Sequence, residues 1–534
     1  MGSRRDPGEF FWQDSPGRAE ILAHSWFFQP TTRLDALVEA SRLHRVVVLT
    51  GKAGAGKSSL AKALARPEIA GGSVPDGFVH AIAILSNDTN PASLGDDLER
   101  QLFGSVPGFV EAVAEFGRSV PLPEREKLDA LARKVLQPLA YLVQKPELRI
   151  VLDGFDRLSE LTRDAVREAV AAWSENVRTV IIARPDTPGC PAGFTLDHGL
   201  TPRDALDRYL TSRQVAASAR LAILNRAEGH WLVTRLLADL ILSDPAIDLT
   251  QMPSTVNETY AKLLDQAQAP CASNQTFTHV LGLLAIAGEG PVLPLSLLAQ
   301  ACQSLGGPEG SDGVREVLGH LGGLVARRDA GTGGAHAGLF HATLAEYLLD
   351  PSASGAGFPL DVRAMHEAMI QAIDALATTA KHDRGDPVHH YAMLREADHL
   401  WALGNAERTL ASLRSRELPE PRENLRRGLQ WLGRFRDQFD EDNPNILDLR
   451  GSIASWRSRS GNTQEALRLC AELLPEQERA LGRDHPITLT TRGRFAYFTG
   501  KMGDAREALR LFAELVLFQA PFCSGNVLCP CARA

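Results

Sequence analysis

Four residues near the start of the chain have the types and the spacing of a phosphate-binding loop. Gly51, Gly56, Lys57 and Ser58 fit the pattern G-x-x-x-x-G-K-[ST] within the sequence GKAGAGKS. The β-branched run at 46–50 predicts a buried strand before the loop, and the apolar spacing after it predicts an amphipathic helix. In that context Lys57 is expected to reach the β- and γ-phosphates of a nucleoside triphosphate, and the Ser58 hydroxyl to bind Mg²⁺.

The glycines of this loop would supply the phosphate cradle itself. Because they have no side chains, Gly51, Gly54 and Gly56 let the backbone curl so that successive N–H groups point inward. An anion held there also meets the positive end of the following helix. We therefore expect the loop, together with the adjacent Ser59, to bind ATP or ADP. The alternative is a chance glycine-rich turn between a strand and a helix.

Two carboxylates follow a second apolar run. The sequence LRIVLDGFDRL, residues 148–158, predicts a strand that ends at Asp153. At a strand terminus near Ser58, this carboxylate would hold Mg²⁺ through water. Asp156 is the next carboxylate, and it could orient or deprotonate an attacking water. The alternative for Asp156 is a cap on the helical turn that follows it.

A third apolar run ends in an arginine. The sequence RTVIIARP, residues 178–185, predicts a strand followed by Arg184. At the carboxyl edge of a parallel sheet, this arginine would face the γ-phosphate. It could sense the γ-phosphate, stabilise its transfer, or do both. A solvated arginine at a strand end is the alternative.

Two further elements complete the expected nucleotide module. The sequence VHAIAIL, residues 79–85, predicts another buried strand. Residues 27–43 predict a helix with Thr31 or Thr32 placed to cap it. That helix would either pack over the adenine or cover the sheet without touching the base.

The composition restricts the class of protein. A chain of 534 residues is too long for one core and suggests roughly three to four domains. The formal net charge of −8 does not favour a nucleic-acid backbone as the main partner. Seven cysteines, four of them isolated, fit a reducing compartment. No apolar run reaches the ~18 residues of a transmembrane helix, and the N-terminus lacks the apolar stretch of a signal peptide. We therefore expect a cytoplasmic protein without membrane association.

Taken together, these motifs resemble the signal-transduction NTPases of the STAND class, which includes apoptotic ATPases and NOD-like receptors. The resemblance rests on the segments GKAGAGKS, IVLDGFD, IIARP and LTPRDALDRYLTSR. The departures from the family pattern are Arg157 in place of a second acid after Asp156, Ala183 in place of the serine before Arg184, and Thr32-Arg33 in place of a Gly-Arg pair. These departures concern the hydrolysis of the nucleotide more than its binding, because Lys57, Ser58 and Asp153 match the family pattern.

The resemblance implies two regulatory modules after the ATPase. The segment ILNRAEGHWLVTRLLADLI, which opens a helix after Gly229, looks like the helical lid. A glycine-rich hairpin followed by HATLAEYLLD looks like part of a winged helix. In this class a winged-helix histidine can contact the β-phosphate of ADP and lock a closed form. His341 is the matching position here, and a cap or core role is its alternative.

The predicted site residues form three groups. The nucleotide-binding group is Gly51, Gly54, Gly56, Lys57, Ser58, Ser59, Arg33 and His341. The metal ligands are Ser58 and Asp153, and the catalytic candidates are Asp156 and Arg184. The expected cofactors are ATP or ADP with Mg²⁺.

The last part of the chain repeats itself at a shift of 42 residues. The pairs that align include Asn443-Pro444 with His485-Pro486, Gly461 with Gly503, and Ala466 with Ala508. This spacing resembles the tetratricopeptide repeats of kinesin light chains, in which each unit is a helix pair. Such pairs stack into a solenoid whose concave side binds a protein or peptide. Three cysteines after Leu515 make a poor zinc site, and we expect a truncated or frame-altered terminus there.

The expected fold class is therefore multidomain. An α/β P-loop NTPase with a parallel sheet precedes a helical lid, a winged-helix domain and an all-α repeat solenoid. The predicted boundaries are an N-terminal arm at 1–23, the NTPase at 24–214, the lid at 215–255, the winged-helix-like domain at 256–375, a helical bridge or degenerate repeat at 376–440, the repeats at 441–518 and an irregular tail at 519–534.

Three functions fit this architecture. The first is a bacterial signalling switch in which a ligand on the repeats drives nucleotide exchange and homo-oligomerisation, with slow ATP hydrolysis. The second is a transcriptional regulator of the same class that binds DNA, which the acidic net charge and the lack of a basic recognition helix disfavour. The third is a repeat scaffold whose nucleotide site is structural, which Arg157 in place of an acid keeps open.

Overall fold

The computed structural model describes residues 28–85, 89–125, 128–253, 255–288, 292–328, 335–350, 360–377 and 386–519. The predicted N-terminal arm, the tip of the glycine-rich hairpin and the three C-terminal cysteines lie outside these residues. The chain divides into two compact units, with the division after Gly404; residues 122–129 group with the second unit. The predicted domain boundaries remain predictions.

A five-stranded sheet forms the centre of the first module. Its strands are β1 (Val46–Thr50), β2 (Ala81–Ile84), β3 (Leu148–Asp153), β4 (Val177–Ile182) and β5 (Phe194–Asp197). The spatial order is β2-β3-β4-β1-β5, and every pairing is parallel. The first four strands agree with the apolar runs of the sequence, whereas β5 was not predicted. The predicted parallel sheet is confirmed.

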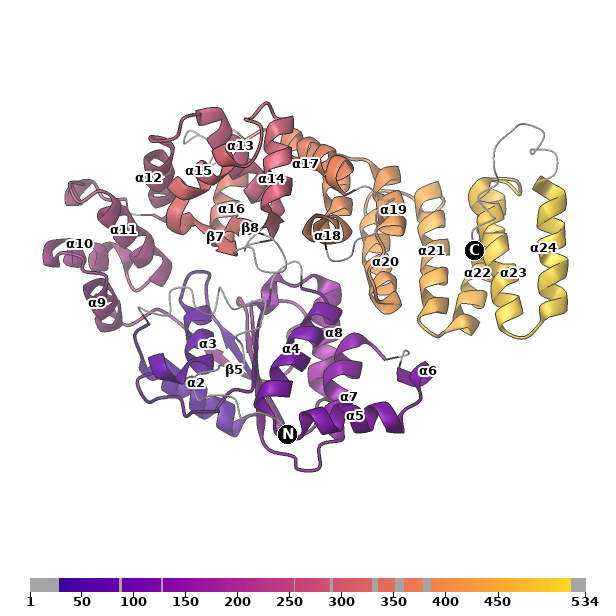
Figure 1. Ribbon diagram of the computed structural model, residues 1–534, viewed down its shortest axis with the longest axis horizontal. Helices are drawn as coiled ribbons and strands as arrows, with labels where there is room; N and C mark the ends of the chain where they lie inside the picture. Colours follow the sequence, from indigo (N-terminus) through magenta and orange to yellow (C-terminus); the bar gives the residue numbers. More distant parts are fainter. Residues whose placement is uncertain are drawn as a thin grey trace. The chain divides into compact units, whose positions relative to one another are not determined.

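The two faces of the sheet pack against different helices. Val47 and Leu49 of β1 join a core with α2 (Thr32–Leu43) and α3 (Lys57–Ala65). The alternate residues Val46 and Val48 join a second core on the opposite face. Figure 1 shows α2 and α3 on one side of the strands and α4 (Pro91–Ser105) on the other. This alternation follows from the period of two in a strand.

The remaining elements of residues 67–172 surround this sheet or lie next to it in sequence. They are η2 (Pro67–Ile69), α5 (Phe109–Ser119), α6 (Leu122–Arg125), η3 (Ala132–Leu136), α7 (Gln137–Ala140), η4 (Phe155–Arg157) and α8 (Glu160–Ala172). The helix α5 contributes Phe109 and Ala112 to the second core, and α8 contributes Val166 and Val170.

A helical segment follows the sheet. It consists of α9 (Arg203–Ser212), α10 (Ala217–Ala227), α11 (Trp231–Ser243) and η5 (Leu249–Gln251). These helices share their own core, which includes Tyr209, Ile223 and Leu237. Because α11 begins at Trp231, the helix opens directly after Gly229, as the sequence predicts.

The next region combines helices with a small antiparallel sheet. Its helices are α12 (Val256–Gln268), α13 (Asn274–Ala287), α14 (Leu295–Ser304), α15 (Asp312–Leu321), η6 (Gly322–Leu324), α16 (Ala342–Leu349), α17 (Val362–Leu376) and α18 (Pro387–Ala402). Its strands are β6 (Leu293–Pro294), β7 (Val325–Arg328) and β8 (His336–Leu339), in the order β6-β8-β7. The hairpin β7–β8 directly before α16 is the element order expected of a winged-helix-like domain.

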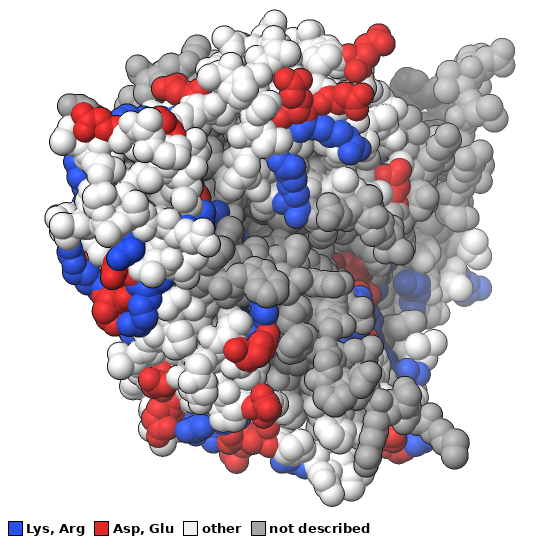
Figure 2. Space-filling model, turned by 60° about the vertical axis from the view of Figure 1, so that its left-hand side comes forward, with Lys and Arg blue, Asp and Glu red and all other residues white. Residues whose placement is uncertain are grey.

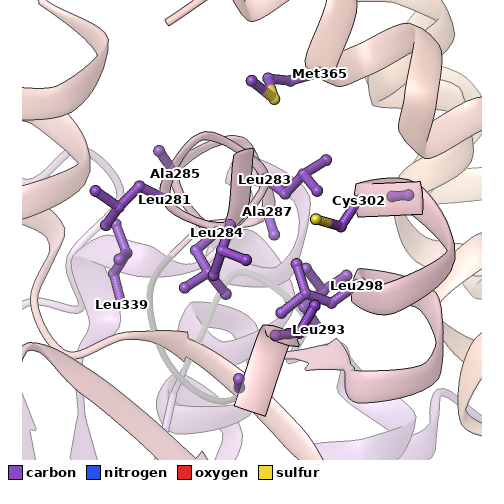
Figure 3. Packing of buried hydrophobic residues seen from close by; sticks show 14 of the residues in the cluster. Leu281, Leu283, Leu284, Ala285, Ala287, Leu293, Leu298, Cys302, Leu339 and Met365 are labelled. Atoms are coloured by element: carbon purple, nitrogen blue, oxygen red, sulfur yellow. The ribbon is translucent and has the colours of Figure 1, made fainter. Parts of the chain in front are cut away.

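The core of this region surrounds α13. Leu281 and Leu284 of α13 are fully buried, as are Leu298 of α14 and Leu339 of β8. Figure 3 shows these side chains converging on α13, with Met365 of α17 on another side of the same helix. The module therefore has a continuous hydrophobic core of its own.

The second unit contains the repeated helices. They are α19 (Ala406–Ser415), α20 (Pro421–Arg436), α21 (Pro444–Arg459), α22 (Thr463–Ala480), α23 (Pro486–Lys501) and α24 (Ala505–Gln519). The start of α21 and the start of α23 differ by the predicted 42 residues, and so do the starts of α22 and α24. The predicted register of helix pairs is confirmed, and with it the fold class of an α/β NTPase followed by helical modules and repeats. None of the described helices is long and apolar enough to cross a membrane.

A close helix contact in this unit depends on one glycine. A Cβ atom on Gly428 of α20 would lie 2.5 Å from the Cζ3 atom of Trp456 in α21. Gly433, one turn further along α20, has nothing within 4 Å of such an atom. The two positions therefore differ in packing while sharing one helix.

We predict that Gly428→Ala destabilises the second unit by about 1–3 kcal/mol through overpacking. Gly433→Ala is the matched control, and it should be neutral or stabilising by up to about 1 kcal/mol because alanine favours the helix. Urea unfolding followed by tryptophan fluorescence measures both. Equal effects of the two substitutions would show that the close contact between Gly428 and Trp456 does not determine the stability of the second unit.

Candidate nucleotide-binding site

The phosphate-binding loop has the backbone that its glycines predict. Gly54 has φ +73° and Gly56 has φ +99°, both in the left-handed region. Gly56 is also the N-cap of α3, so the helix begins at Lys57. The first N–H groups of α3 therefore open onto the loop, where they can receive an anion.

Lys57 lies across this loop. Its Nζ atom donates to the carbonyl oxygens of Gly51 and Lys52, the latter at 2.9 Å. Burial lowers the pKa of the Lys57 ammonium, while the charges of Asp156 and Asp153 act in the opposite direction. The ammonium is thus a partly desolvated cation beside the loop, which strengthens its attraction for phosphate.

Ser58 and Asp153 meet as the sequence predicts. The Ser58 hydroxyl donates to Asp153 Oδ1 at 3.1 Å, and Asp153 is only 2% exposed. Burial raises the pKa of this carboxyl, and the charge of Arg157 lowers it. Two hard oxygen atoms this close together suit one Mg²⁺, which takes few protein ligands and completes its shell with water and phosphate oxygens. The described residues contain no cluster of three His, Cys, Asp or Glu side chains that could hold a metal by themselves.

The order of the strands brings Arg184 to the same edge. Because β4 lies between β1 and β3, residues after β4 emerge between the loop and Asp153. Arg184 Nε pairs with Asp156 Oδ2 at 3.2 Å, and the Arg184 backbone N–H donates to Asp156 Oδ1 at 3.2 Å. The alternative role of Asp156 as a helix cap is not observed. Ser159 caps α8 instead, by accepting the Thr162 N–H at 3.2 Å.

Arg184 also reaches the winged-helix-like region. Its Nη1 atom lies 3.2 Å from Glu346 Oε1 on α16. This ion pair joins residues that are 162 positions apart in the chain. It connects the end of β4 with the helix that follows the hairpin.

His341 is the N-cap of α16. Its Nδ1 atom accepts the Thr343 N–H at 3.2 Å, so the alternative of a cap role is observed. Burial lowers the pKa of His341 to about 3, and the charges of Arg157, Arg184, Arg235 and Lys57 contribute in that order. A phosphate group would offset part of the positive field that these four cations create. A contact between His341 and a bound nucleotide remains a prediction.

Arg157 belongs to this electrostatic cluster. It ends the turn η4, and its charge acts on Asp153, Lys57 and His341. A Cβ atom on Gly154 would lie 2.8 Å from the Leu85 carbonyl oxygen and 3.2 Å from Arg157 Cδ. The turn η4 therefore requires glycine at position 154, three residues before Arg157. The replacement of an acid by Arg157 adds a cation where the family pattern has a carboxylate.

Arg33 lies beside the end of β5. Its Nη1 atom would be 3.0 Å from a Cβ atom on Gly199, which follows β5 in sequence. The structure thus brings the loop residues, Asp153, Asp156 and Arg184 together at one edge of the sheet. Arg33 lies next to this group, and a contact with nucleotide stays a prediction for it and for Ser59.

Two residues that hold the loop on the side of β5 and α11 were not predicted from the sequence. The Leu232 N–H at the start of α11 donates to the Gly54 carbonyl at 2.9 Å. His198 Nε2 lies 2.7 Å from the Ala55 carbonyl oxygen. The available signal was the segment FTLDHGL, which contains the unpredicted strand β5 and His198.

A cavity of about 280 Å³ opens beside the loop. Its walls include Ala53 and Gly54 of the loop, His230 before α11, and Thr343 and Glu346 of α16. The loop, the helical segment and the winged-helix-like region therefore share one cavity. On the face shown in Figure 2, the positive and negative side chains of the described residues are interspersed.

The buried His341 predicts a dependence of stability on acid. The unfolded histidine takes up a proton below pH 6.5, while the folded one, with a pKa of about 3, remains neutral. Stability therefore rises with pH across this window and falls on acidification. Between pH 7 and pH 5, the free energy of unfolding of the original chain should fall by about 2 kcal/mol more than that of His341→Gln.

Urea unfolding at the two pH values measures this difference. His320→Gln is the matched control, because His320 is exposed on α15 and its removal leaves the buried histidine in place. Identical acid sensitivity of His341→Gln and the original chain would contradict the prediction.

Comparisons with known proteins agree with this geometry. Residues 29–182 match the family described as AAA ATPase domain. No curated protein matches the chain. Among solved structures, the chain is similar to a STAND protein with a tetratricopeptide repeat sensor from Pyrococcus horikoshii. The identity is 13%, the match covers 93% of this chain and 71% of that one, and the TM-score is 0.45.

Two further structures are similar over smaller parts. A putative kinesin light chain with nearly identical TPR-like repeats from Podosopora anserina has 17% identity over 30% of this chain and 88% of its own, with a TM-score of 0.20. RuvB from Thermotoga maritima has 13% identity over 59% of this chain and 92% of its own, with a TM-score of 0.23. The family match and the loop geometry agree on a P-loop NTPase module within residues 29–182.

Proposed function

We propose that the chain is a STAND-type signalling switch that binds ATP or ADP with Mg²⁺. The nucleotide occupies the loop at 51–58, and Ser58 with Asp153 holds the metal. When bound, Mg²⁺ neutralises charge on the phosphates and orients them. The repeats bind a protein or peptide, and that binding favours the exchange of ADP for ATP and the formation of a homo-oligomer.

The observation that carries this proposal is the ion pair between Arg184 and Glu346. Arg184 lies at the edge of the sheet where a γ-phosphate would be, next to Asp156. Its other partner, Glu346, belongs to α16. A γ-phosphate would compete with Glu346 for the same guanidinium. The charge on the nucleotide thereby influences how firmly the winged-helix-like region is held.

A second attachment supports the same interpretation. The Leu232 N–H bond to the Gly54 carbonyl fixes the first turn of α11 against the loop. A Cβ atom on Gly54 would lie 2.5 Å from Leu232 Cβ, so the two segments touch directly. Both regulatory modules thus contact residues of the nucleotide site. A ligand then needs only a few kcal/mol of preference for the open form to shift the population.

Slow hydrolysis follows from the partners of Asp156. Each of its oxygen atoms is bonded to Arg184, one through the backbone N–H and one through the side chain. A carboxylate with both oxygens engaged is a poor base for an attacking water. The next residue is Arg157, which cannot accept a proton. We therefore propose that turnover needs a rearrangement of Arg184.

The switch is tested by nucleotide binding and by molecular mass. We expect Lys57→Ala to abolish binding of ATP and ADP, measured by calorimetry, while the fold is retained. Light scattering should detect a larger assembly with ATP and Mg²⁺ in the original chain and a monomer with ADP. A mass that stays unchanged in ATP, both alone and with a bound partner, would reject the switch and favour a scaffold with a structural nucleotide.

Removing the winged-helix carboxylate should favour the open form. We predict that Glu346→Gln accelerates the release of ADP by up to about fivefold, because a half-exposed ion pair contributes roughly 1 kcal/mol or less. Glu367→Gln is the matched control, since Glu367 pairs with Arg363 within α17. Stopped-flow measurement with a fluorescent ADP analogue gives the rates. Equal release rates in both variants would contradict a role for Glu346 in holding Arg184.

A further inference from the structure

We propose that His198 is a positioning residue for nucleotide binding: its imidazole donates from Nε2 to the Ala55 carbonyl and thereby aims the Gly56 N–H at the phosphate. The inference rests on the proposed function, because it concerns how the same loop receives a nucleotide. Neither the loop motif nor the family match assigns His198, which follows the fifth strand and lies outside residues 29–182.

The imidazole lies directly behind the loop. His198 is 4% exposed and Ala55 is 3% exposed, and Nε2 is 2.7 Å from the Ala55 oxygen. The His198 side chain also lies close to two glycines of the loop, Gly51 and Gly56. A Cβ atom on Gly51 would lie 3.1 Å from His198 Cβ, and one on Gly56 would lie 3.6 Å from Nε2.

The position of the proton follows from the partner. A carbonyl oxygen only accepts, so Nε2 must carry the hydrogen. The other nitrogen, Nδ1, is buried without a hydrogen-bond partner among the described residues. The pKa of His198 is lowered to about 4, chiefly by burial; the bond to Ala55 opposes this shift, and the charges of Arg33 and Lys57 contribute to it. The imidazole is therefore neutral at physiological pH, with its proton on Nε2.

Planarity of the peptide connects this bond to the phosphate side. The Ala55 carbonyl and the Gly56 N–H belong to one trans peptide unit, so they point in opposite directions. When His198 holds the oxygen toward β5, the N–H is directed away from β5, into the loop. Gly56 has φ +99°, in the region where glycine rotates easily. Without a fixed carbonyl, this peptide could turn and present its oxygen to the phosphate.

A second donor links the same carbonyl to the helical segment. The Thr201 hydroxyl donates to the Ala55 oxygen at 3.2 Å, and the Thr201 N–H donates to the Gly229 carbonyl at 2.9 Å. Gly229 lies just before α11, the helix that contacts Gly54. The orientation of one peptide in the loop thus depends on β5 and on the start of the helical segment.

The test compares a variant that keeps a donor with one that keeps only the ring. His198→Gln retains an amide N–H, whereas His198→Phe retains the shape and removes the donor. With ADP and Mg²⁺ as the probe, we expect calorimetry to show about tenfold weaker binding for His198→Phe. We expect His198→Gln to stay within about threefold of the original chain. Thr201→Val, which removes the longer bond, should have an intermediate effect.

Stability is measured in parallel to separate positioning from a general structural role. If His198→Phe binds ADP as tightly as the original chain, the inference is wrong. The inference is also wrong if His198→Phe and His198→Gln weaken ADP binding equally and the weakening follows a fall in melting temperature. Selective ¹⁵N labelling of histidine, assigned with His198→Gln, reports the tautomer without relying on a folded Phe variant. A proton on Nδ1 in place of Nε2 would overturn the inference.

The failure of the proposed function has a different signature. If the original chain binds ADP no better than Lys57→Ala does, no nucleotide site exists at the loop. If the original chain binds ADP more tightly than Lys57→Ala does, and the His198 variants bind it as tightly as the original chain, the nucleotide site exists and His198 does not position it.

Discussion

Backbone pairing of β4 with both β1 and β3 decides where the polar residues of the site lie. Since the three strands are parallel, their carboxyl ends meet at one edge. β1 ends at the phosphate-binding loop, β3 ends at Asp153, and Arg184 follows β4 by two residues. A register error of one residue would move Asp153 off the edge and turn its side chain to the other face. The buried Val, Ile and Leu side chains on both faces fix that register.

The site that results concentrates positive charge in a region of low exposure. Lys57, Arg157 and Arg184 act together on the pKa of His341, and Arg235 adds to them from α11. Asp153 and Asp156 offset part of this charge. Glu346, which pairs with Arg184, and Asp239, which pairs with Arg235, offset more of it. An anion bound there would add to this compensation.

The parts of the fold that the sequence predicts are those encoded locally or by repetition. The spacing from Gly51 to Ser58 specifies a loop between adjacent elements, and the shift of 42 residues specifies two copies of one helix pair. By contrast, β5 has only four residues, mostly exposed, and no apolar run marks it. The pair of Arg184 with Glu346 and the bond of His198 to Ala55 join distant segments. No local pattern encodes them, because each depends on the packing of separate modules.

The distance in sequence between Arg184 and Glu346 has a consequence during synthesis. The sheet is complete once residue 197 has left the ribosome, whereas Glu346 follows about 150 residues later, or roughly 7–30 s at ordinary rates of translation. In that interval the nascent ATPase module has its loop, Asp153 and Arg184 but not the carboxylate of α16. A nucleotide from the surrounding medium would therefore meet an uncovered site. On this order of events, a nucleotide that binds to the nascent chain does so before the carboxylate of α16 has been made.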